Sequence, residues 1–205
     1  MRTFTYQKVS GIAALIHSLL GFITLIVVLY SLGIAPSPDR LAEIARSNPF
    51  PIVLLDIIKV LSSITALILI NFTNRYFKDN NLESVKWGSV AGKISVFCLL
   101  TNAVISLLLV LSASSEISLL TPERISTMRI LVIVFGICSI FFNGLWYIAI
   151  NRTALKNKRF PASFCYLGIA LGIISLIPPL SQIVLVLVIV WSLVLGIILL
   201  REIKS

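Results

Sequence analysis

The chain has 205 residues, of which 58% are hydrophobic and only 12% are charged, and its mean hydropathy is +1.05. Soluble domains are usually about 45–50% apolar and about 25% charged, so this composition excludes an ordinary soluble globule, a disordered tail, a collagen-like fibre and a disulfide-rich secreted peptide. The class that remains is an integral membrane protein.

Six apolar stretches stand out along the chain, against the roughly 20 residues that a helix needs to cross a bilayer. In chain order they cover residues 10–34, 51–72, 88–111, 129–150, 163–177 and 182–200. The sequence therefore predicts an all-α fold, a polytopic bundle of six transmembrane helices. No segment between the spans is long enough to bury a core of its own, so residues 1–205 are expected to form a single membrane domain.

The first and second outer loops carry the same helix-start signal. Ser37-Pro38-Asp39 and Thr121-Pro122-Glu123 each place a hydroxyl at the N-cap, a proline at the first helical position and an acid in the first turn. These residue types stabilise the amino end of a helix. We therefore expect a short extracytoplasmic helix in each of these loops.

The last two stretches are separated only by Pro178-Pro179-Leu180-Ser181. Adjacent prolines remove two backbone donors and disfavour helix in the preceding residue. One helix over both stretches would also be nearly twice as long as a bilayer is thick. A tight hairpin is therefore expected here.

The basic residues indicate the orientation of the chain. The expected outer loops carry only Arg40, Arg46, Arg124 and Arg129, Lys59 lies within a span, and the rest of the 17 Lys and Arg residues fall on the inner side. Cytoplasmic loops of membrane proteins carry such an excess of Lys and Arg. We therefore expect a multi-pass protein of the bacterial inner membrane with both termini in the cytoplasm.

The net charge of +9 has a simple interpretation in the same terms. It follows from this inner bias, which the anionic inner leaflet favours, and the basic residues form no separate domain for nucleic acid. The basic run 151–161 either holds lipid head groups or only fixes topology. The expected partner is the lipid bilayer, with a membrane-protein partner or a homo-oligomer left open and no nucleic acid.

Aromatic residues give a second indication of depth. Trp87, Trp146 and Tyr147 fall at the expected inner interface and Tyr30 falls near the outer one, where membrane proteins concentrate aromatic rings. Trp191 lies near the middle of the sixth span and is expected to pack against neighbouring helices.

Polar residues within the spans are the candidate site. Counting about 1.5 Å per residue, Asp56, Lys59 and Asn102 fall in one outer layer, whereas His17 and Asn143 fall in an inner layer. Polar groups are costly in hydrocarbon, so each is expected to face protein or water. Small and polar stripes of this kind are also typical of ordinary packing seams between helices.

Asp56 and Lys59 are three residues apart and so are neighbours on one helix surface. They are either a self-contained ion pair whose lysine reaches outward or the floor of an outward-facing pocket for an ion or a small polar ligand. His17, the only histidine, is either a satisfied hydrogen-bond partner or a proton-coupling group.

The sequence shows none of the motifs expected of common enzymes. One histidine cannot supply a bis-histidine haem site, and H-E-x-x-H, G-x-S-x-G and P-loop patterns do not occur. We therefore predict no catalytic residue, no cofactor and no metal site.

One outline runs along nearly the whole chain: a short outer helix, an acid in the second span, a basic inner loop, a small-residue fourth span and a charged tail. Its residues are 38–48, Leu55-Asp56-Ile57, 74–86, Asn151-Arg152, Tyr166-Leu167-Gly168, Trp191-Ser192-Leu193 and Arg201-Glu202-Ile203-Lys204. This outline resembles a bacterial family of uncharacterised six-helix integral membrane proteins, known only as a domain of unknown function. The resemblance implies a fold and a location, and it implies no activity.

Three functions follow as hypotheses. The leading one is a non-enzymatic accessory or scaffold protein that acts through lipid and helix–helix contacts. The second is a small-molecule or ion transporter with its substrate near Asp56, Lys59 and Asn102, and the third is an intramembrane enzyme.

Overall fold

The computed structural model describes residues 2–33, 38–77, 83–114 and 121–201. Within these ranges the protein is all-α, with seven α-helices and no strand. The helices are α1 (Arg2–Val27), α2 (Pro38–Ser47), α3 (Phe50–Tyr76), α4 (Glu83–Ser114), α5 (Pro122–Lys156), α6 (Ala162–Ser175) and α7 (Ser181–Arg201). A π-helical turn (Val28–Leu32) extends α1, and a 3₁₀ turn (Pro178–Leu180) joins α6 to α7.

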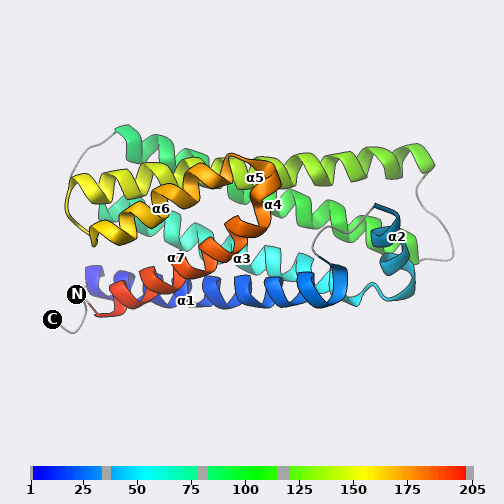
Figure 1. Cartoon of the computed structure of the whole chain (residues 1–205), viewed down its shortest axis with the longest axis horizontal. Coiled ribbons are helices and arrows are strands. Elements are labelled where there is room, and N and C mark those ends of the chain that lie inside the picture. Colours follow the sequence, from blue (N-terminus) through cyan, green and yellow to red (C-terminus); the bar gives the residue numbers. More distant parts are fainter. Residues whose placement is uncertain (1, 34–37, 78–82, 115–120, 202–205) are drawn as a thin grey trace.

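Six of the helices pack around a ring. Following the ring, α1 contacts α3, α3 contacts α4, α4 contacts α5, α5 contacts α6, α6 contacts α7, and α7 returns to α1. The short helix α2 lies at one end of the bundle and contacts α4 (Figure 1). The start of α1 and the end of α7 lie together at the opposite end, which we call the terminal end of the bundle.

Five helical segments are long and apolar enough to cross a membrane. They are Tyr6–Leu32, Phe50–Tyr76, Glu83–Ala113, Glu123–Lys156 and Pro178–Arg201. Among the described residues, these segments coincide with five of the six predicted apolar stretches. The remaining one, 163–177, forms α6, whose 14 residues rise only about 21 Å at 1.5 Å per residue, short of a bilayer core of about 30 Å.

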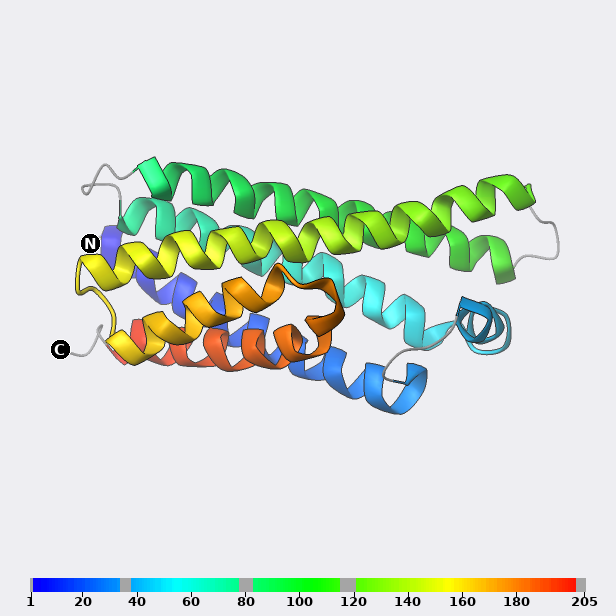
Figure 2. The same ribbon diagram turned by 45° about the horizontal axis from the view of Figure 1, so that its top comes forward.

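The hairpin between α6 and α7 forms at the predicted prolines. It turns back well short of the far end of α5 (Figure 2). Ser175, the last residue of α6, lies beside Gly144, and α5 continues from there to Pro122, about 33 Å further along the helix axis.

The turn itself leaves no backbone N–H group without a partner. Pro178 and Pro179 have no N–H group. The N–H groups of Leu176 and Ile177 donate to the carbonyls of Ile173 and Ile174 in the last turn of α6, and those of Leu180 and Ser181 donate to the carbonyls of Ile177 and Pro178. Hydrocarbon tolerates backbone only when its polar groups are bonded internally, so this turn is suited to lie inside a bilayer.

The two outer loops differ, contrary to the prediction. The first contains α2 as a separate short helix, although its cap residue Ser37 lies outside the described residues. In the second, Thr121 does cap a helix by accepting a hydrogen bond from the Arg124 N–H at 3.4 Å, but that helix is α5 itself and runs unbroken to Lys156. The predicted separate helix is therefore wrong, because no glycine or proline after Pro122 interrupts the helix before the apolar span begins.

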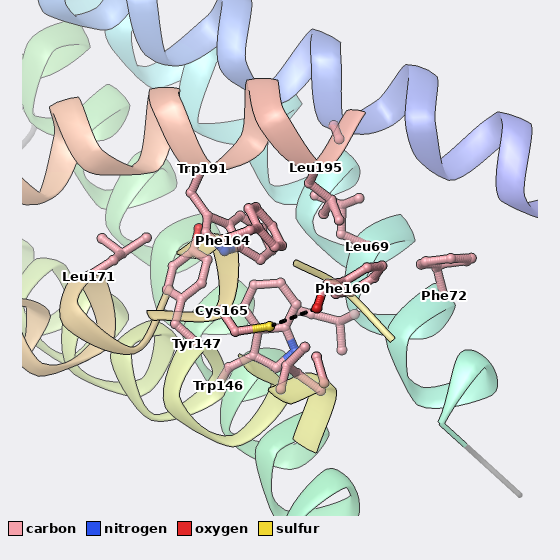
Figure 3. Packing of buried hydrophobic residues seen from close by; sticks show 14 of the residues in the cluster. Leu69, Phe72, Trp146, Tyr147, Phe160, Phe164, Cys165, Leu171, Trp191 and Leu195 are labelled. Carbon is pink, nitrogen blue, oxygen red and sulfur yellow. Dashed lines mark hydrogen bonds between the residues drawn. The ribbon is translucent and has the colours of Figure 1, made fainter. Parts of the chain in front are cut away.

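The core of the terminal end is aromatic. Trp191 stacks on Phe164 and makes edge contacts with Trp146 and Tyr147, with ring centroids 4.8–5.8 Å apart (Figure 3). Trp191 is buried between helices as predicted. Trp146 and Tyr147 are also buried, so the prediction that they are interfacial anchors is wrong: their rings pack against Trp191 instead.

Candidate functional site

Asp56 and Lys59 form an ion pair on α3, about 9 Å along the helix from Phe50. Lys59 Nζ donates to Asp56 Oδ1 at 2.7 Å. The Asp56 side chain is fully buried, whereas that of Lys59 is 31% exposed, which is the geometry of a lysine that reaches outward from a buried partner. The second carboxylate oxygen, Asp56 Oδ2, is buried and has no described hydrogen-bond partner.

Asn102 forms a separate contact between α4 and α5. Its Nδ2 donates to the Val132 carbonyl at 2.6 Å, and its Oδ1 is buried without a described partner. A Cβ atom at Gly136 would lie 3.3 Å from the same Nδ2, so the absent side chain at Gly136 leaves space for the amide. No described hydrogen bond joins Asn102 to Asp56 or Lys59.

His17 joins α1 to α3 through Thr65, with His17 Nδ1 2.8 Å from Thr65 Oγ1. The single hydroxyl proton of Thr65 is donated to the Ser62 carbonyl at 2.9 Å. With the Thr65 proton on that carbonyl, the contact requires the His17 tautomer that carries its proton on Nδ1. Asn143 is half-buried on α5, and no described hydrogen bond connects it to His17.

Of the five candidate residues, the described hydrogen bonds and ion pairs join only Asp56 and Lys59 to each other. Asp56 and Lys59 touch each other, while His17, Asn102 and Asn143 lie on other helices with other neighbours. Among the described residues no three His, Cys, Asp or Glu side chains are grouped so that they could hold a metal ion.

Asn151 is a buried polar residue that sequence reasoning missed. It is fully buried on α5, its Oδ1 accepts a hydrogen bond from Trp191 Nε1 at 3.2 Å, and its Nδ2 donates to the Tyr147 carbonyl at 2.8 Å. It also packs against α6, because a Cβ atom at Gly168 would lie only 2.2 Å from the Asn151 amide. One amide thus links α5, α6 and α7. The basic neighbours of Asn151 in the sequence suggested a surface segment instead.

A hollow with polar groups in its lining lies between α4 and α5 near the terminal end. This α4–α5 groove has a volume of about 840 Å³. Arg152, Lys156 and the hydroxyls of Ser84 and Thr153 line one part of it, and Trp87 stands beside them with two-thirds of its surface exposed. The rest of the lining is apolar. The sequence signals for this groove were the i, i+4 spacing of Arg152 and Lys156 and the matching depth of Trp87.

Comparison of the chain with family models, with curated proteins and with solved structures finds no match. The resemblance to the six-helix family of unknown function therefore stays a prediction.

Proposed function

We propose that this multi-pass helical membrane protein is a non-enzymatic accessory or scaffold protein of the bacterial inner membrane, with both termini in the cytoplasm. It would act through its contacts with lipid and with other transmembrane helices. The observation that carries this proposal is that its buried polar side chains join neighbouring helices at separate depths.

Several of these contacts bond a side chain of one helix to a group on the next. His17 bonds Thr65 between α1 and α3, and Ser95 donates to the Ser139 carbonyl between α4 and α5 at 2.8 Å. Ser18 donates to the Ile189 carbonyl between α1 and α7 at 2.9 Å. Interhelical hydrogen bonds of this type, with small residues, are how helices associate in lipid.

Complementation in a strain that lacks the chromosomal gene tests this role. The readout is the growth or envelope defect that the deletion produces, measured at matched protein abundance. The paired variant Asp56→Leu/Lys59→Met removes both charges together and is expected to complement fully. Failure to complement, with normal membrane levels of the variant, would contradict the accessory role.

A transporter is the second candidate, because Asp56 Oδ2 is buried with no described partner. An ionisable group inside a membrane bundle is a functional-site hypothesis by default, and a free carboxylate oxygen is a natural ligand for a cation. The variant Asp56→Asn discriminates between the two candidates. A transporter would lose its function with Asp56→Asn and also with the paired variant, whereas an accessory protein would keep its function with both.

A further inference from the structure

We propose that the α4–α5 groove binds one anionic phospholipid from the leaflet at the terminal end of the bundle. The lipid phosphate would lie against Arg152 and Lys156, and an acyl chain would follow the apolar part of the groove. This proposal needs the bundle to lie in a membrane, and it does not depend on the accessory role.

The shape of the groove comes from small residues on its floor. A Cβ atom at Gly88 would lie 2.6 Å from Ala149 Cβ, so α4 and α5 are nearly in backbone contact there. Larger side chains, among them Trp87 on α4 and Phe142 on α5, also line the groove. The result is a furrow of about 840 Å³, within the range of about 300–1,000 Å³ that is usual for small-molecule sites.

The charge of the groove is concentrated in two side chains. Arg152 and Lys156 are four residues apart on α5, so they project from the same face, and both are exposed. Neither forms an ion pair with a described carboxylate, since the one described salt bridge joins Lys59 to Asp56. Glu83, the acid at the start of α4, accepts a hydrogen bond from Trp87 Nε1 at 3.5 Å and forms no described ion pair with Arg152 or Lys156. Two cations without a described counter-charge thus line the groove.

Polarity changes along the groove as it does along a lipid. The hydroxyls of Ser84 and Thr153 lie 3.3 Å apart at the charged end. Trp87 is 67% exposed at that level, and Val90 and Ile94 extend the groove as exposed apolar residues over the next two turns of α4. Tryptophan is enriched where head groups meet hydrocarbon, and basic pockets between transmembrane helices bind anionic head groups. A packed protein helix would match the apolar part but would leave the two cations without a counter-charge.

Fluorescence quenching in vesicles tests the proposal with Trp87 as the natural reporter. Trp146 and Trp191 are only 3% and 1% exposed, whereas Trp87 faces the groove, and the variant Trp87→Phe measures the background. The protein is reconstituted in vesicles of unlabelled phosphatidylcholine. To these is added either phosphatidylglycerol or phosphatidylcholine whose acyl chains carry bromine. At equal mole fraction, brominated phosphatidylglycerol is expected to quench more strongly. Its relative association constant should be higher by about fivefold per cation, the value of one basic residue near a membrane surface.

A matched pair of variants separates the groove from general surface charge. Arg152→Gln/Lys156→Gln is expected to abolish the preference for phosphatidylglycerol. Lys8→Gln/Arg201→Gln removes the same charge from exposed residues on α1 and α7 at the same end and is expected to retain the preference. Equal quenching by the two lipids, or equal effects of the two variants, would overturn the proposal. Efficient disulfide cross-linking of two Val90→Cys copies would also overturn it, because a second chain would then occupy the groove.

Discussion

At the scale of single residues, buried amides and hydroxyls determine which helices meet in this bundle. Asn151 is the clearest case, since it bonds to Trp191 on α7 and packs against Gly168 on α6. In hydrocarbon no water competes for these groups, so each bond selects one arrangement of helices over another. The same bond makes the terminal end sensitive to substitution, because a buried indole N–H without an acceptor is costly.

A double-mutant cycle measures the Asn151–Trp191 bond. We expect Asn151→Ala to lower the free energy of unfolding by about 1–3 kcal/mol, because it leaves Trp191 Nε1 unpaired. Trp191→Phe keeps the ring packing and removes the donor. The double variant should be more stable than the sum of the single losses implies, by about 0.6–1.7 kcal/mol. Unfolding by sodium dodecyl sulfate in mixed micelles provides the four values, and strict additivity would mean that the two residues are not coupled.

The ion pair on α3 is expected to be stable only while both charges are present. Lys59→Met leaves Asp56 buried without its counter-charge, and we expect it to lower the free energy of unfolding by about 3 kcal/mol. Asp56→Leu/Lys59→Met removes both charges and should return to within about 1 kcal/mol of the native protein, because no uncompensated charge remains. The same micelle unfolding assay compares them. A double variant as unstable as Lys59→Met would show that Asp56 has a further partner.

Sequence alone could predict some of these residue contacts. The spacing of Asp56 and Lys59 was enough to predict their pairing, because neighbours three apart on a helix must meet. Trp146 and Tyr147 were placed at the interface although they are buried, since the aromatic-belt rule does not say which face of a helix a ring lies on. Asn151 was missed because its partner Trp191 lies 40 residues away, and a contact of that kind depends on how the helices are arranged.

At the scale of helices, the hairpin of α6 and α7 is the unusual element. Its two prolines were sufficient to predict the break, and their missing N–H groups also explain why the turn suits hydrocarbon. The length of α6 was overestimated, because Leu176 and Ile177 are as apolar as the helix but belong to the turn. The prediction of a separate helix before the fourth span was also wrong about a helix end. The cap signal at Thr121 marks where α5 starts and says nothing about where it ends.

Cysteine labelling tests the depth of the hairpin turn. In a variant whose three native cysteines are replaced by alanine, Ser126→Cys is exposed near the start of α5, the end we propose to be outside, and should react with a membrane-impermeant maleimide. Leu180→Cys in the turn should react only after detergent unfolds the protein, because a turn that ends short of the far end of α5 is expected to lie within the hydrocarbon. Equal labelling of the two positions in intact vesicles would contradict a turn within the membrane.

At the scale of the whole molecule, the ring of helices has its start and its end on the same side (Figure 1). Hydropathy was enough to predict the five long spans, since apolar length is what a bilayer selects. Which helices are neighbours around the ring could not be predicted, because small residues such as Gly88, Gly144 and Gly172 meet partners far away in the sequence. Whether the candidate polar residues face one another could not be predicted either, because equal depth does not place residues on facing helices.

The side of the membrane on which each chain end lies is the decisive test of this topology. Epitope tags are placed before Arg2 and after Arg201, and protease is added to intact spheroplasts, with Ser126→Cys labelling as the marker for the outer side. If both chain ends lie in the cytoplasm, both tags survive until the membrane is permeabilised, while position 126 is labelled from outside. Digestion of one tag and protection of the other would place the ends on opposite sides of the membrane and would contradict this fold in the bilayer.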